Sequence, residues 1–151
     1  MNGPSPSCAS ALPGRTTSGP FRWNDSYRVG VAAFDEEHRR LLALANDIQR
    51  ASLEGRERED IAAMLDRLRE ETSRHFVREE EWMRSTRYAD SEDHRAKHNK
   101  LNAEILLFMQ QYQAGHIDPA RLAGFLIDWI LHHILHEDMK YKEALRETGV
   151  Q

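Results

Sequence analysis

The stretch WILHHILHEDMKY, residues 129–141, decides the fold because it carries an apolar helical face and two polar residues that share it. Up to His133 the apolar face is formed by residues three or four apart, and beyond His133 it continues only if Asp138 and Tyr141 point inward. His133 and Asp138 are five residues apart, so in a regular α-helix their side chains diverge by about 140°. We therefore predict a one-residue π-bulge between them, which brings both side chains onto one site.

Three further segments show helical periodicity, and no alternating run of the sequence is long enough to suggest a sheet. Capping signals place the expected helix boundaries. The first expected helix begins after Phe34 with Asp35 as N-cap, and the second runs from about Asp60 to Ser85. The third begins after a cap at Asp90 or Ser91. The fourth runs from Asp118 to about Arg146, with Pro119 at the first helical position. Short polar connections require consecutive helices to be antiparallel. The sequence therefore predicts an all-α fold, an up-down-up-down four-helix bundle.

The chain divides into a short polar leader and one compact domain. Residues 1–20 are rich in Ser, Pro and Gly and contain the only cysteine, Cys8, and we predict a disordered leader there. The chain has 151 residues, 40% of them hydrophobic and 30% charged, and we expect residues 21–151 to form a single bundle domain with its own core. An extended segment at the start of this domain is expected to pack on the bundle.

Charge and cysteine usage restrict the partners and the compartment. The formal net charge is −4, and no basic stripe alternates with aromatic residues, so no nucleic-acid partner is expected. The sequence shows neither a secretory signal nor an apolar run of about 18 residues, so we expect no membrane association. A single cysteine without a partner in the chain fits a reducing compartment, and we predict a cytoplasmic protein.

Five histidines and two carboxylates fall on the inward faces of the expected helices, where an unligated polar group is costly. They are His38, His75, Glu79, His94, His98, His133 and Asp138. His75 and Glu79 are four residues apart, as are His94 and His98, so each pair projects from adjacent helical turns toward one point. Imidazole combined with carboxylate suits iron, with manganese less favoured, whereas zinc prefers four-coordinate sites.

The number of donors indicates two metal ions rather than one. Five imidazoles and two carboxylates are too many for one octahedral ion, but they suit two ions that share both carboxylates and one solvent-derived oxygen. The histidines then divide three and two. The ion with three histidines is closed, and the ion with two keeps one position open for a small molecule from outside.

These motifs resemble those of a known family, the hemerythrins, and specifically the bacterial hemerythrins. The matching stretches are Trp23–Asn46 with VGVAAFDEEH, HFVREEEWM at 75–83, HRAKH at 94–98 after Tyr88, and WILHHILHEDMKY at 129–141. The resemblance implies a four-helix bundle, of which myohemerythrin is an established example. It also implies two non-haem iron ions with an oxo or hydroxo bridge that bind dioxygen reversibly. The chain would then be an oxygen carrier, store or delivery protein and not an enzyme.

Residue by residue, the resemblance also implies a role for each donor. It implies that His94, His98 and His133 bind the closed iron, that His38 and His75 bind the open iron, and that Glu79 and Asp138 bridge the two. The apolar residues it places around the dioxygen pocket are Phe76, Trp129 and Ile130. Relatives commonly have leucine at the position of Ile130 and phenylalanine at that of Leu101, and these two departures bear on oxygen affinity and autoxidation rate.

Two other functions use similar sites. A di-iron oxidase of the ferritin-like class typically carries glutamate three residues before histidine, and none of the five histidines has one there. A sensor of dioxygen, nitric oxide or iron would act through a separate partner, since the sequence shows no signalling domain. For an oxygen carrier we expect a monomer or a weak homo-oligomer, and the sequence identifies no protein that receives the oxygen.

Several other residues are expected to have structural roles. Three histidines outside the ligand set are expected at the surface without a metal: His116, His132 and His136. In the run Glu79–Glu81 only Glu79 is expected to point inward. A second apolar stripe on the last helix is formed by Ile127, Leu131 and Leu135. We expect the leader, a neighbouring helix or a second copy of the chain to cover this stripe.

Overall fold

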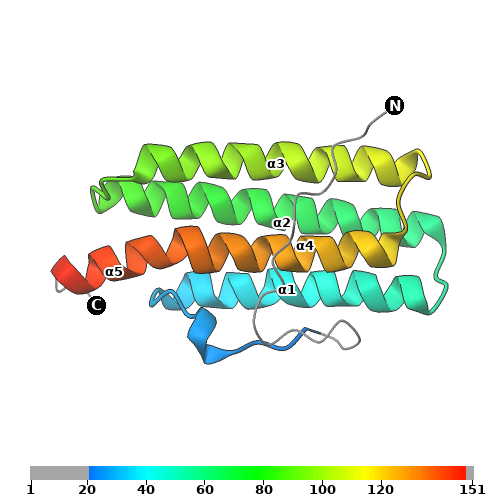
Figure 1. The fold of residues 1–151 in the computed structure, drawn as a ribbon, viewed down its shortest axis with the longest axis horizontal. Helices are drawn as coiled ribbons and strands as arrows, with labels where there is room; N and C mark the ends of the chain where they lie inside the picture. The colour runs from blue at the N-terminus through cyan, green and yellow to red at the C-terminus, as the bar shows by residue number, and fades with distance from the viewer. Residues whose placement is uncertain (1–20, 149–151) are drawn as a thin grey trace.

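The computed structural model describes residues 21–148, except the side chains of residues 145–148, as a bundle of four long helices (Figure 1). The predicted leader with Cys8 lies outside the described residues. The elements are the 3₁₀ turn η1 (Asp25–Tyr27), α1 (Ala32–Leu53), α2 (Arg58–Ser85), α3 (Ser91–Gln113), α4 (Pro119–His133), the π-helical turn η2 (Ile134–Asp138) and α5 (Met139–Thr148). No strand occurs among them. The predicted up-down-up-down all-α bundle is confirmed, because α2, α3 and α4 each run antiparallel to the helix before, and α5 continues the direction of α4 (Figure 1).

The helices close around one core, because α1 packs against α2 and α4, and α3 packs against the same two helices. Each helix contributes apolar residues at helical spacing, and burial of one such side chain stabilises the fold by about 1.5–3 kcal/mol. The most deeply buried of them include Leu42, Ile48, Leu68, Leu122 and Ile127. None of the described helices is long and apolar enough to cross a membrane.

The start of α1 differs from the prediction. The helix begins at Ala32, and Val31 occupies the N-cap position without a side-chain hydrogen bond. The Asp35 carboxylate instead accepts from the backbone N–H of Val29 at 2.7 Å. Val29 is fully buried, and a buried N–H without an acceptor is costly. Asp35 therefore provides an acceptor for the segment that precedes α1 and does not cap the helix. The predicted N-cap role of Asp35 is therefore wrong.

The segment before α1 packs along the bundle, as predicted (Figure 1). The side-chain amide of Asn46 on α1 accepts from the backbone N–H of Phe21 at 2.9 Å and donates to the Phe21 carbonyl at 2.8 Å. Near the other end of the segment, the Lys142 ammonium on α5 donates to the carbonyl of Arg28 at 2.7 Å. These bonds tie the extended segment to both the first and the last helix.

The start of α4 follows local capping chemistry, whereas α2 and α3 begin without a side-chain hydrogen bond from the N-cap residue. The Asp118 carboxylate accepts from the Ala120 N–H at 2.9 Å, and Pro119 occupies the first helical position, as predicted. Helix α3 begins at Ser91 after Asp90, as predicted, whereas α2 begins at Arg58, two residues before the predicted start. The Arg58 guanidinium donates to the carbonyl of Gln113 at 2.8 Å and so satisfies the C-terminal end of α3. This long-range bond cannot be read from the local sequence.

The phase shift in the last helix is a π-helical turn, as predicted. Residues Ile134–Asp138 form five consecutive π-helical residues between α4 and α5. His133 before the turn and Asp138 at its end are both buried in the same interior. The second apolar stripe lies largely inside the protein, because Ile127 and Leu131 are buried.

Candidate metal centre

The structure brings all seven predicted ligand residues together in the bundle interior. They come from every long helix and from the π-turn: His38 on α1, His75 and Glu79 on α2, His94 and His98 on α3, His133 on α4, and Asp138 on η2. Each of them is buried, and the most exposed, His133, retains only 6% of its accessible surface. Buried polar groups in this number require partners, since an unpaired one costs free energy.

The donor atoms of these residues form two overlapping groups. In each group one ligand atom per residue lies within 4.8 Å of all the others. The larger group, here called the five-residue group, consists of Glu79, His94, His98, His133 and Asp138. The smaller one, called the four-residue group, consists of His38, His75, Glu79 and Asp138. The two groups share both carboxylates and divide the histidines three and two.

The shared carboxylates lie between histidines of the two groups. Glu79 contacts His75 Nε2 with Oε2 at 2.8 Å and His94 Nε2 with Oε1 at 3.1 Å. Asp138 contacts His38 Nε2 with Oδ2 at 3.2 Å and both His94 and His133 Nε2 with Oδ1 at 3.0 Å. Each carboxylate therefore presents one oxygen to each group, which is the arrangement that a bridging ligand requires.

The interior contains unsatisfied donor atoms that fit a bound cation. Both oxygens of Glu79, both oxygens of Asp138 and Nε2 of His94 are buried without a hydrogen-bond partner in good geometry. In addition, Nε2 of His38 lies 2.9 Å from Nε2 of His75, and Nε2 of His98 lies 3.1 Å from Nε2 of His133. Buried lone pairs that converge on one another are costly unless a proton or a cation lies between them, and metal coordination removes this cost. The residues present therefore fit two metal ions.

The protonation of this interior follows from its burial and its carboxylates. Burial alone lowers the pKa of His75, but the hydrogen bond with Glu37 and the close contact with Glu79 raise it to about 10. Burial likewise opposes protonation of His94, but contacts with Asp138 and Glu79 raise its pKa to about 9. At neutral pH without metal, both imidazoles are therefore protonated on both ring nitrogens and positively charged. A metal that binds them must displace these protons.

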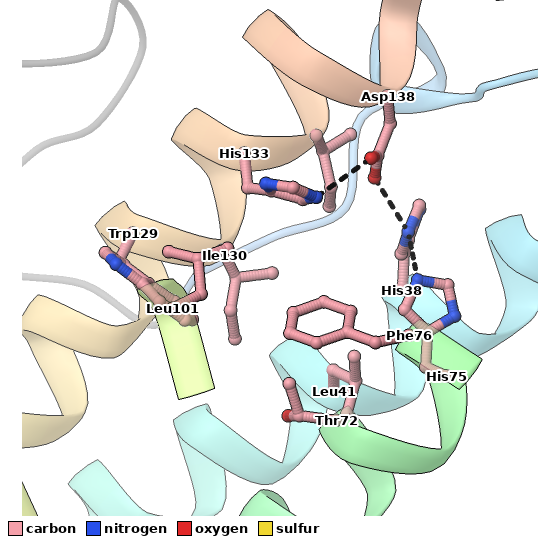
Figure 2. Close-up of a pocket in the computed structure, with 11 residues that line it drawn as sticks. His38, Leu41, Thr72, His75, Phe76, Leu101, Trp129, Ile130, His133 and Asp138 are labelled. Carbon is pink, nitrogen blue, oxygen red and sulfur yellow. Dashed lines mark hydrogen bonds and ion pairs between the residues drawn. The ribbon is translucent and has the colours of Figure 1, made fainter. Parts of the chain in front are cut away.

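A small cavity adjoins the four-residue group (Figure 2). It holds about 10 Å³ of space for the centre of a water-sized molecule, which is room for one such molecule. The three residues predicted for a dioxygen pocket, Phe76, Trp129 and Ile130, all line it, together with Leu101. Among the predicted ligand residues, His38, His75, His133 and Asp138 also line it, whereas Glu79, His94 and His98 do not. Both histidines of the four-residue group therefore face the cavity, and one of the three histidines of the five-residue group does.

Sequence reasoning missed Ile134 of η2 on the cavity wall, and it also missed two residues of α1 and α2, Leu41 and Thr72. Both are almost fully buried. The Thr72 hydroxyl donates to the carbonyl of Leu68 one turn earlier at 2.7 Å, so its hydrogen is committed within α2. The signal that could have found them is spacing, because each lies three residues from a histidine of the four-residue group and so on an adjacent part of the same helical face.

Two glutamates outside the predicted set contact the Nδ1 side of histidines in the two donor groups. His75 Nδ1–H donates to Glu37 at 2.5 Å, and His98 Nδ1–H donates to Glu80 at 2.9 Å. Glu80 was predicted to be solvated, and this prediction is wrong because the side chain is only 18% exposed and reaches α3. The run Glu79–Glu81 therefore contributes two inward carboxylates rather than one.

The other histidines lie apart from the centre. His116, His132 and His136 are exposed, as predicted for them, and belong to neither group. The rings of His132 and His136 lie side by side at a centroid distance of 4.3 Å. Phe76, by contrast, stacks inside the protein on His98, with the ring centroids 3.8 Å apart and the planes 7° apart. This stack holds one histidine ring of the five-residue group in place.

Known proteins resemble this chain over most of its length. The chain is 29% identical over 126 residues to a bacteriohemerythrin of Pseudomonas aeruginosa, and the matched region covers 83% of this chain and 82% of that relative. It is 30% identical over 132 residues to a hemerythrin-like protein of Naegleria gruberi, covering 86% of this chain and 98% of that protein. A crystal structure of wild-type hemerythrin has a TM-score of 0.75 and 26% sequence identity, and covers 84% of this chain and 98% of its own.

The match to the family itself extends across the whole bundle. Residues 29–145 match the hemerythrin HHE cation binding domain. These residues include all seven members of the two donor groups and the π-turn that joins α4 to α5. The chain therefore belongs to the hemerythrin family.

Proposed function

We propose that this protein binds dioxygen reversibly at a non-haem di-iron centre and acts as an oxygen carrier, store or delivery protein. One observation carries the proposal. The cavity described above is lined by both histidines of the four-residue group and by only one, His133, of the three histidines of the five-residue group. A small molecule in the cavity therefore meets the metal that has fewer protein ligands.

The donor groups suggest how the two irons are held. His94, His98 and His133 would hold one iron, His38 and His75 would hold the other, and Glu79 and Asp138 would bridge them. The bound di-iron centre would supply the two electrons that reversible dioxygen binding requires, and an oxo or hydroxo bridge would complete its coordination. The two buried carboxylates offset half of the four positive charges of two ferrous ions, so the loaded interior is less costly than a bare cation pair.

The residues around the cavity exclude water from the open position. Phe76 and Ile130 are buried, and Trp129 is half-buried with its indole N–H donating to Glu104 on α3 at 2.7 Å. This bond directs the polar edge of the indole toward α3. An apolar wall disfavours charged or protonated products in the cavity, because no polar group solvates them there. Release of the unchanged gas is then favoured over oxidation of the centre.

The test is anaerobic reconstitution of the metal-free chain with ferrous iron, followed by repeated exposure to air and vacuum. We expect two irons per chain and a visible charge-transfer band that appears in air and disappears under vacuum. One iron per chain, or a band that does not reverse, contradicts the proposal. Oxidation of added organic substrates indicates an oxidase instead, and an oxygen-dependent change of surface exposure without reversible storage indicates a sensor.

A further inference from the structure

Two glutamates, each adjacent in sequence to a residue of the donor groups, accept a hydrogen bond from a histidine on the neighbouring helix. Glu37 directly precedes His38 on α1, yet its carboxylate accepts from His75 Nδ1–H on α2. Glu80 directly follows Glu79 on α2, yet it accepts from His98 Nδ1–H on α3. One of these histidines belongs to the four-residue group and the other to the five-residue group. Each half of the centre therefore has one carboxylate behind one of its imidazoles.

The two carboxylates differ in how firmly they are held. Glu37 bonds His75 with one oxygen, and its other oxygen lies 2.6 Å from Nε of Arg78. Glu80 bonds His98 with one oxygen, but its other oxygen lies 3.9 Å from Nε of Arg95. Both glutamates are mostly shielded, with side chains 16% and 18% exposed. Glu37 is thus fixed at both oxygens, whereas Glu80 is fixed at one.

A carboxylate on Nδ1 has two effects on a ligand imidazole. It places the remaining proton on Nδ1, so that Nε2 is the nitrogen free to bind metal, and it fixes the plane of the ring. In both cases Nε2 is the atom that faces the shared carboxylates, since His75 Nε2 lies 2.8 Å from Glu79 and His98 Nε2 lies 3.9 Å from it. The geometry is that of a support for a metal ligand.

On the basis of the proposed di-iron site, we infer that Glu37 and Glu80 are positioning residues that retain one metal each, and that Glu37 matters more. Glu37 supports one of only two imidazoles in the four-residue group, whereas Glu80 supports one of three in the five-residue group. Loss of one ordered imidazole removes a larger share of the nitrogen donors in the smaller group. The Glu37 substitution should therefore release one iron selectively.

The test compares metal retention in glutamate variants with that in matched neighbours. Ferrous iron is loaded anaerobically, and its extraction by a chromogenic ferrous chelator is followed with time. Glu37→Ala should weaken retention of one of the two irons by roughly 10–100-fold, and Glu80→Ala should have a smaller effect. Glu37→Gln should recover part of the retention, because its amide oxygen still accepts from Nδ1–H. The controls are Glu36→Ala and Glu81→Ala, which replace exposed neighbours.

Thermal unfolding of the metal-free variants separates positioning from general stability. We expect Glu37→Ala and Glu36→Ala to differ in iron extraction by far more than their metal-free melting temperatures account for. Extraction from both Glu37→Ala and Glu80→Ala at the rate of the two controls overturns the inference, as does an equal loss in Glu37→Ala and Glu37→Gln.

The same measurements separate this inference from the proposed function. A wild-type chain that holds two irons but shows no reversible band contradicts oxygen binding, while the ranking of the variants still tests the glutamates. A wild-type chain that holds no iron overturns both. A wild-type chain with a reversible band and variants that match the controls overturns only the positioning role.

Discussion

The two donor groups use the same carboxylates but are built from different parts of the bundle. The five-residue group takes its histidines from α3 and α4, and the four-residue group takes its histidines from α1 and α2. Only the second group has all its histidines on the cavity wall. The comparison shows that the two halves of the centre are unequal, with three histidines in one group and two in the other, and the proposed function places the small molecule on the side with two.

The largest expected effect comes from removing what the groups share. Glu79→Ala should abolish retention of both irons, because the Glu79 oxygens lie against histidines of both groups. Iron per chain after anaerobic loading and desalting measures the effect, with Glu81→Ala as the neighbouring control. Two retained irons in Glu79→Ala would show that the two groups do not depend on a shared carboxylate.

The next variants should separate the groups. His38→Ala removes one of two imidazoles from the four-residue group, and we expect a chain with one iron and no reversible band. Exposed His132→Ala on α4 is the matched control and should keep two irons. If His38→Ala retains two irons and a normal band, the cavity side of the centre has been assigned to the wrong group.

Acid should weaken the loading of both groups. The pKa values of about 10 for His75 and about 9 for His94 mean that both are protonated at pH 7 in the metal-free chain. Since metal replaces protons, the affinity for ferrous iron should rise between pH 6 and pH 8.5 by up to about tenfold per pH unit for each proton released. Calorimetry in buffers of different ionisation enthalpy counts these protons. An affinity that is flat over this range contradicts the protonated resting state.

A change in the cavity wall should leave metal binding intact and alter only the gas chemistry. Ile130→Ala enlarges the cavity, and we expect two irons per chain but autoxidation several times faster, because water gains access. The truncation should also cost about 2–5 kcal/mol in unfolding free energy, so melting temperature is measured in parallel. Ile130→Val keeps most of the side chain and is expected to behave almost as wild type. An unchanged autoxidation rate in Ile130→Ala would remove this residue from the pocket.

The smallest effect should come from the outer ion pair behind Glu37. Arg78→Gln removes the partner of one Glu37 oxygen but leaves the bond to His75 in place. Because the Arg78 side chain is 51% exposed, solvent screens this pair, and we expect less than a threefold change in iron retention. A change as large as that of Glu37→Ala would show that the arginine, and not the carboxylate, holds His75.

Periodicity was sufficient to predict most of the fold because it reports which face of each helix is buried. It placed four helices, and the mismatch between His133 and Asp138 predicted the π-turn that the structure contains. Local reasoning was wrong at two residues. Asp35 was predicted to cap α1 but accepts from the Val29 N–H, and Glu80 was predicted to be solvated but contacts His98. Both errors involve a polar side chain whose partner lies outside its own helical turn.

The sequence by itself determined which residues face the interior, since the spacing of apolar and donor side chains along a helix is a local property. Helical spacing could not assign the seven donors to two groups: the family resemblance implied that division, and the packing of the helices produces it and places both histidines of the four-residue group on the cavity wall. Tertiary structure alone decided that Glu37 and Glu80 reach across to α2 and α3. These features depend on the rotation and register of one helix against another, and such relations arise only when the helices pack.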